Sequence, residues 1–124
     1  MKQHVHTDIT TEQFTVLQFI SQNEDVTSTQ IAHAMGVGKS SITALVNRLV
    51  ERGMIKRQRN ENDRRIVYLN LTNEGIYVVK ETEEAIYRYL EEKLIHFTID
   101  DIQGFLLSLE KLAQLMEDEE GDIS

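Results

Sequence analysis

The residues best suited to chemistry form a cationic cluster in the middle of the chain. Residues 36–72 hold eight basic and three acidic side chains, a net charge of +5, whereas the whole chain has a formal net charge of −8. Basic clusters neutralise phosphates and release their counterions, so they mark surfaces that bind nucleic acids. We therefore expect this stretch to bind a polyanion, and its arrangement indicates DNA.

A helix predicted over residues 38–53 carries three of the eight basic residues of this cluster. Apolar residues recur along one side of it with helical spacing, at Ile42, Leu45, Val46, Leu49 and Val50. The opposite face carries small, polar and cationic side chains: Lys39, Ser40, Ser41, Thr43, Ala44, Asn47 and Arg48. Such a face can approach base edges closely and hydrogen-bond them. Taken alone, it could equally be an ordinary solvent-exposed face.

Two shorter helices are predicted before this one. Thr10 or Thr11 can cap the first helix. Thr27 or Ser28 begins the second, and Gly36 ends it, where a left-handed backbone favours glycine. Two short helices joined by a glycine-containing turn form a helix-turn-helix, whose second helix enters the major groove of DNA.

A β-hairpin is predicted over residues 54–71. Residues 66–71 are rich in β-branched and aromatic types, and the polar residues 60–63 are typical of a turn between two strands. The basic residues of this hairpin would make it a wing that lies along the backbone or in the minor groove. A charged hairpin that is merely solvated is the alternative, but the position directly after a candidate recognition helix argues against it.

Two long amphipathic helices are predicted in residues 73–124, the second beginning near Thr98. Their apolar faces need a partner, and pairing with a second copy about a two-fold axis is the simplest solution. The expected dimer-interface residues are Ile86, Tyr89, Leu90, Leu94, Ile102, Phe105, Leu106, Leu109, Leu112 and Met116. The predicted fold is mainly α with a small β-hairpin, a winged helix-turn-helix over residues 9–72 followed by helical dimerisation over residues 73–124.

Composition narrows the function further. The chain has no cysteine, which excludes disulfides and thiolate metal sites within it. Neither a membrane span nor a secretory signal is visible, so we expect a cytoplasmic protein. No catalytic set stands out, and we expect no enzyme. A metal sensor or enzyme using His4, His6, His33 and His96 is a third, weaker hypothesis.

The residues of the hairpin resemble the MarR family of bacterial winged-helix regulators. The resemblance rests on Asp-x-Arg, five further residues and Leu-Thr, which here runs from Asp63 to Thr72 and continues in Glu74 and Gly75. The opening at residues 9–17 and the sequence SSITALVNRLVERGMIKR also look like the family. The similarity covers about residues 9–116.

The resemblance implies a role for each matching residue. Arg65 would enter the minor groove, Asp63 would hold it by a charge-assisted hydrogen bond, and Arg64 would reach the DNA backbone. Together with Lys39, Arg57 and Arg59 of the basic cluster, the full set of expected DNA-binding residues is Thr27, Ser28, Lys39, Ser40, Ser41, Thr43, Asn47, Arg48, Arg57, Arg59, Asp63, Arg64 and Arg65.

The implied function is that of a homodimeric repressor, without a cofactor, that reads pseudo-palindromic double-stranded DNA and is relieved by a small aromatic or drug-like effector. Members of the family carry a further N-terminal helix at the dimer interface and ligand pocket. Only residues 1–8 precede Ile9, so we expect that helix to be reduced or missing, or the chain to be truncated. A winged-helix module that binds protein instead of DNA is the alternative, suggested by the acidic remainder of the chain.

Overall fold

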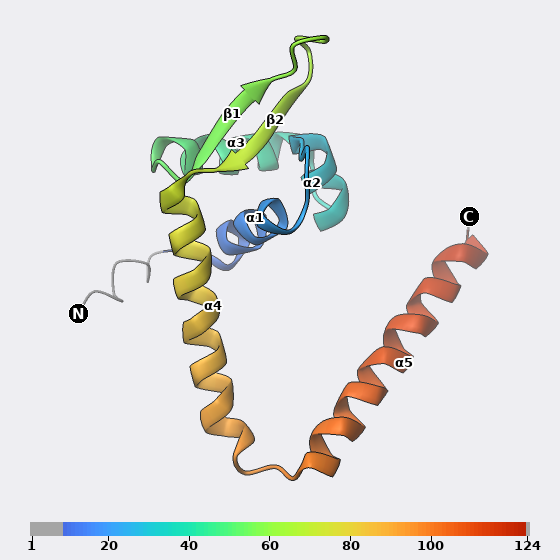
Figure 1. Ribbon diagram of the computed structural model, residues 1–124. Helices are drawn as coiled ribbons and strands as arrows, with labels where there is room; N and C mark the ends of the chain where they lie inside the picture. Colours follow the sequence, from blue (N-terminus) through green and yellow to red (C-terminus); the bar gives the residue numbers. More distant parts are fainter. Residues whose placement is uncertain (1–8, 124) are drawn as a thin grey trace. The chain divides into compact units, whose positions relative to one another are not determined.

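The computed structural model describes residues 9–123, with side chains described through residue 118. The elements in chain order are α1 (Thr11–Gln22), α2 (Ser28–Met35), α3 (Lys39–Glu51), β1 (Ile55–Arg59), β2 (Val67–Leu71), α4 (Asn73–Leu94) and α5 (Ile99–Ile123). The predicted fold class, mainly helical with one β-hairpin, is confirmed (Figure 1). The expected short N-terminal segment, residues 1–8, lies outside the described residues.

Local side-chain signals define the first two helices. Thr10 caps α1 and Thr27 caps α2, each by a complete capping box with the glutamine three residues later. Gly36 ends α2 in the left-handed conformation, with φ of 69°. The predicted starts of α1 and α2 and the predicted end of α2 are therefore confirmed. The reciprocal caps stabilise these ends because they satisfy backbone groups that a helix terminus otherwise leaves free.

The core lies between α1, α2, α3, the hairpin and the first turns of α4. Its most deeply buried side chains come from all of these elements: Val16, Leu17, Val26, Ile31, Ile42, Val46, Leu49, Ile55 and Val78. Burial of these apolar surfaces is the main stabilising contribution to such a domain. It also fixes which face of α3 remains available to a ligand.

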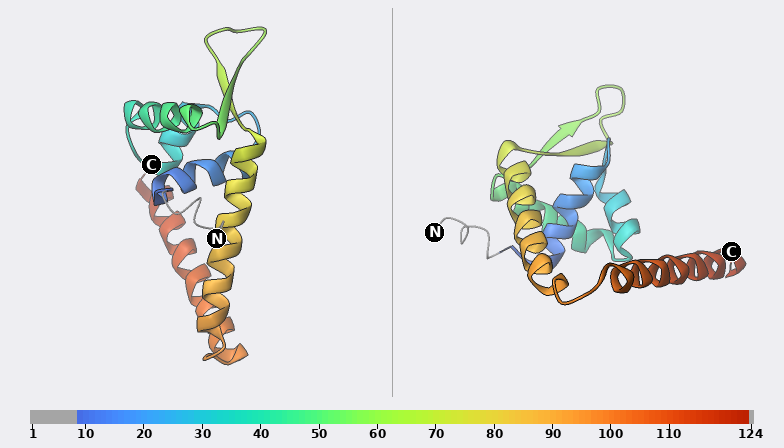
Figure 2. Two further views of the ribbon diagram at one scale, coloured as in Figure 1. Left: turned by 90° about the vertical axis from the view of Figure 1, so that its left-hand side faces the viewer. Right: turned by 60° about the horizontal axis from the view of Figure 1, so that its bottom comes forward.

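The two strands pair antiparallel, with Arg57 of β1 opposite Leu69 of β2. The Leu69 amide donates to the Val26 carbonyl at 2.8 Å, so the segment before α2 holds the hairpin at its centre. Figure 2 shows the loop between the strands extending away from α1, α2 and α3. The core thus anchors the base of the hairpin while its tip projects.

The start of α4 is fastened to the turn before β1. The Thr72 amide donates to the Met54 carbonyl at 3.0 Å, and the Thr72 hydroxyl donates to the Gly53 carbonyl at 2.5 Å. Further along, the Gln18 side chain of α1 donates to the Glu83 carboxylate of α4 at 2.9 Å. The first compact unit accordingly extends through Ala85, into the middle of α4.

The second compact unit begins at Ile86 and contains the end of α4 and all of α5. Thr98 and Asp101 exchange hydrogen bonds of 3.0 Å at the start of α5, which begins near Thr98 as predicted. Nine of the ten expected interface residues are exposed in the single chain, and Ile102 is half-buried.

No helix in the described part of the chain is long and apolar enough to cross a membrane.

Candidate nucleic-acid interface

The outer face of α3 is polar and accessible. Ile42, Val46 and Leu49 are at most 1 % exposed and hold the opposite side of the helix in the core. All six predicted DNA-binding residues of this helix are exposed: Lys39, Ser40, Ser41, Thr43, Asn47 and Arg48. The N-cap residue, Gly38, makes no side-chain cap, so the first amides of α3 are open to an external acceptor such as a phosphate.

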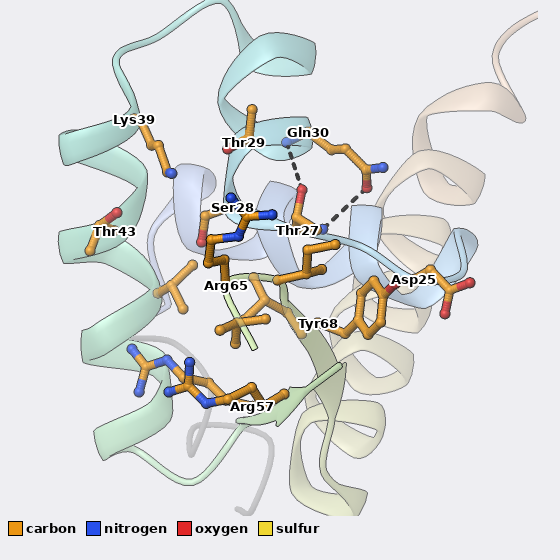
Figure 3. Close-up of a pocket in the computed structure, with 15 residues that line it drawn as sticks. Asp25, Thr27, Ser28, Thr29, Gln30, Lys39, Thr43, Arg57, Arg65 and Tyr68 are labelled. Carbon is orange, nitrogen blue, oxygen red and sulfur yellow. Dashed lines mark hydrogen bonds between the residues drawn. The ribbon is translucent and has the colours of Figure 1, made fainter. Parts of the chain in front are cut away.

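A cleft of about 860 Å³ separates α3 from the hairpin and the start of α2 (Figure 3). Seven predicted DNA-binding residues line it: Thr27, Ser28, Lys39, Thr43, Arg57, Arg59 and Arg65. Four of these seven are cations, and Asp25 is the one carboxylate among all the residues that line the cleft. Side chains from three elements therefore converge on one strongly basic hollow, which is suited to a phosphate backbone.

The floor of this cleft includes the first turn of α2. The Thr27 hydroxyl oxygen accepts the Gln30 amide at 3.2 Å, and the Gln30 side chain accepts the Thr27 amide at 3.1 Å. Ser28 is half-buried beside them. The partial positive charge of a helix N-terminus adds to the surrounding cations and favours an anion at this point.

The wing tip carries the predicted ion pair. Arg65 Nε donates to Asp63 Oδ1 and Arg65 Nη2 to Asp63 Oδ2, both at 3.0 Å, and the Arg65 amide also donates to Oδ1 at 3.1 Å. These bonds lower the pKa of the Asp63 carboxyl and raise the pKa of Arg65. The Arg65 side chain is nevertheless 90 % exposed, so the pair orients the guanidinium without covering it.

Asn60 organises the same loop, a role that was not predicted from the sequence. Its Oδ1 accepts the amides of Asn62 and Asp63 at 2.7 and 2.9 Å, while its Nδ2 donates to the Tyr68 hydroxyl at 2.9 Å. Asn side chains commonly accept from the backbone two residues on, and this was the available sequence signal. Asn60 therefore holds Asp63, which in turn holds Arg65.

The other predicted DNA-binding residues are distributed outside this cleft. Arg48 lines a separate depression beside the first turn of α1. The Arg64 carbonyl accepts a hydrogen bond of 2.7 Å from Nη1 of Arg59, one of the residues that line the cleft, and this bond ties the first strand to the loop. Ser40 and Ser41 lie in the exposed first turn of α3. Asn47 instead accepts a hydrogen bond from Arg57 of β1.

The histidines do not form a metal site in the described residues. Among the side chains that the structure describes, residues 9–118, no three of His, Asp or Glu gather as potential metal ligands. His33 of α2 and His96 after α4 lie in separate compact units. His4 and His6 lie outside the described residues.

A helix-turn-helix followed directly by a basic two-stranded wing defines a winged helix-turn-helix protein. Residues 7–66 match the sequence profile of the MarR family. The Bacillus subtilis HTH-type regulator YsmB is 30 % identical over 109 residues, covering 88 % of this chain and 75 % of YsmB. The chain spans only 55 % of a Thauera aromatica protein named for the hcr operon, to which it is 36 % identical over 92 residues.

Solved structures agree with these sequence relatives. Streptococcus pneumoniae FabT, crystallised with DNA, superposes with a TM-score of 0.79 at 28 % identity, covering 90 % of this chain and 78 % of FabT. A MarR family protein from Bacillus stearothermophilus superposes with a TM-score of 0.81 at 29 % identity, covering 94 % of this chain and 81 % of the other. The chain belongs to the MarR family of transcriptional regulators.

Proposed function

We propose that this chain is a repressor that binds a pseudo-palindromic DNA site as a homodimer. In each half-site, α3 lies in the major groove and the wing lies in the neighbouring minor groove. The observation that carries the proposal is the basic cleft beside the exposed polar face of α3. The DNA-bound state of FabT, a relative of the same fold, supports it.

The wing supports DNA over protein as the ligand. A protein-binding module would need neither a cleft lined by four cations nor an exposed arginine aimed by a carboxylate. Both features match what a phosphate backbone and a narrow, electronegative minor groove attract. The proposal also includes relief of repression by a small aromatic or drug-like molecule, which the family resemblance implies.

Selection from a random pool of double-stranded DNA tests the proposed function. We expect the chain to enrich an inverted repeat, and fluorescence anisotropy on that repeat should show affinity that falls steeply with salt. The log–log slope should be about −0.9 for each phosphate that a cation neutralises. A chain that enriches no sequence, or whose binding ignores salt, does not read DNA in this way.

The dimer is proposed from the apolar surface of the second unit. Leu90 and Leu94 of α4, and Phe105, Leu109 and Met116 of α5, are 40–64 % exposed in the single chain. A soluble protein rarely leaves contiguous apolar surface of this kind uncovered, and a second copy covers it symmetrically.

Sedimentation equilibrium measures the oligomeric state directly. We expect a particle of twice the 14.4 kDa chain mass at micromolar concentration. The DNA complex should contain two chains per inverted repeat. A monomer that binds a single half-site with full affinity would contradict the dimer while leaving DNA recognition intact.

A further inference from the structure

The side chain of Asn47 is engaged by the wing. Asn47 is exposed on the outer face of α3, and Arg57 Nη2 of β1 donates to its Oδ1. A guanidinium carries N–H donors and no acceptor, so only the oxygen of the Asn47 amide can face it. The Nδ2 group therefore keeps both of its N–H donors for another partner, whereas one of the two lone pairs of Oδ1 is already used.

Strand alternation explains why Arg57 reaches α3. Arg57 and Arg59 line the cleft beside α3, whereas Lys56 and Gln58 line a groove with Ile20 on the other side of the hairpin. Successive residues of a strand point to opposite faces, so this division follows from the backbone. Because Arg57 pairs with Leu69, which is only 2 % exposed, its backbone is anchored at the buried centre of the hairpin.

The Arg57 contact changes what Asn47 can read. A free asparagine recognises adenine with two bonds, in which Oδ1 accepts from N6 and Nδ2 donates to N7. Here Oδ1 already accepts a charge-assisted bond from Arg57, which is stronger than a neutral one. The bond occupies one of the two lone pairs of Oδ1 and fixes the amide against Arg57, so Oδ1 is a poorer acceptor for adenine N6. What the pair offers to a base is therefore mainly donors: the Asn47 Nδ2 group and the remaining guanidinium N–H groups.

Guanine is the base whose major-groove edge matches donors alone. It presents two acceptors, N7 and O6, whereas adenine presents one acceptor and one donor. We propose that Asn47 and Arg57 form one reading unit, whose donor-rich edge selects guanine over adenine at one base pair of each half-site. This inference rests on the proposed DNA-binding function and names the two residues that set part of its specificity.

The test compares sequence motifs selected from a random double-stranded DNA pool by the wild type and by variants. We expect a guanine at one position per half-site for the wild type. Arg57→Ala frees Asn47 Oδ1, so the preference at that position should move toward adenine, by about tenfold in relative affinity. Lys56→Ala is the matched control, because it removes the same charge from the adjacent residue on the opposite face of the hairpin.

A second variant decides the matter if Arg57→Ala binds too weakly to enrich DNA. Asn47→Asp retains an oxygen for Arg57 but removes the Nδ2 donor. On the wild-type site and its single-base-pair replacements, competition anisotropy should show that the guanine preference is lost at the same position. An unchanged preference in Asn47→Asp overturns the reading unit.

The remaining outcomes separate this inference from the proposed function. A wild-type chain that enriches no motif contradicts DNA recognition itself, and with it the reading unit. A clear motif that Arg57→Ala leaves unaltered, or in which Arg57 and Asn47 variants change different positions, overturns only the reading unit. A wild-type motif with adenine at the shared position overturns it as well.

Discussion

Arg65→Ala is expected to weaken binding to the selected DNA site by about 1–3 kcal/mol, or roughly 5- to 150-fold, the range of a good groove contact. The physical reason is that the guanidinium is both exposed and already oriented. Two side-chain hydrogen bonds of 3.0 Å to Asp63 fix its plane, yet its side chain stays 90 % exposed. Fluorescence anisotropy measures the loss, and the melting temperature should not change.

The matched control for this prediction is Arg64→Ala. It removes the same charge from the neighbouring residue, whose side chain the resemblance places on the DNA backbone. We expect a smaller loss that is uniform across DNA sequences, with the salt slope reduced by about one. Equal affinity of Arg65→Ala and the wild type would remove Arg65 from the minor groove.

The charge state of the wing pair is constant at neutral pH. The hydrogen bonds from Arg65 lower the pKa of Asp63 from its usual 3.8. Because the pKa of Asp63 is lower in the folded chain than in the unfolded chain, the ion pair is fully formed at every pH above the unfolded pKa. It is lost only as the pH falls through the lower, folded pKa. Titration of Asp63 therefore contributes nothing to DNA binding between pH 6 and 8, so a pH dependence in that range has another source.

Local signals made the helices and the wing predictable from sequence. Thr10 and Thr27 lie three residues before the glutamines that complete their capping boxes, and Ile42, Val46 and Leu49 follow one side of α3. Each of these signals is contained within a few residues and needs no knowledge of the tertiary structure. The Asp63–Arg65 pair, two residues apart, is local in the same sense.

The contacts between elements were not predictable in this way. Arg57 and Asn47 were both assigned to DNA, but their contact with each other depends on how the hairpin lies against α3. The bond between Gln18 and Glu83 joins residues 65 positions apart, and no periodic pattern marks either side chain. Packing of the core determines these placements, so they emerge only in three dimensions.

Gly75→Ala is expected to destabilise the first unit by about 1–3 kcal/mol, the usual range for overpacking in a filled site. A β-carbon at this position would lie 2.2 Å from the Met54 carbonyl oxygen and 3.4 Å from Leu71 Cβ. The nearest obstacle is backbone, and that carbonyl is fixed because it accepts the Thr72 amide. The Gly75 amide is itself bonded to the Thr72 hydroxyl oxygen at 3.0 Å, so α4 cannot shift without losing its cap.

The sign of this effect separates close packing from ordinary helix propensity. Helix propensity favours alanine over glycine by about 1 kcal/mol. A destabilising effect of Gly75→Ala can therefore come only from the lack of room for the β-carbon. Gly104→Ala in α5 is the matched control, because a β-carbon there meets nothing within 4 Å in the single chain. In urea unfolding, Gly104→Ala should raise the midpoint and Gly75→Ala should lower it. If both substitutions raised the midpoint, the contact between Gly75 and Met54 would be looser than the structure has it. The close approach of α4 to the turn before β1 would then not explain why this position holds a glycine.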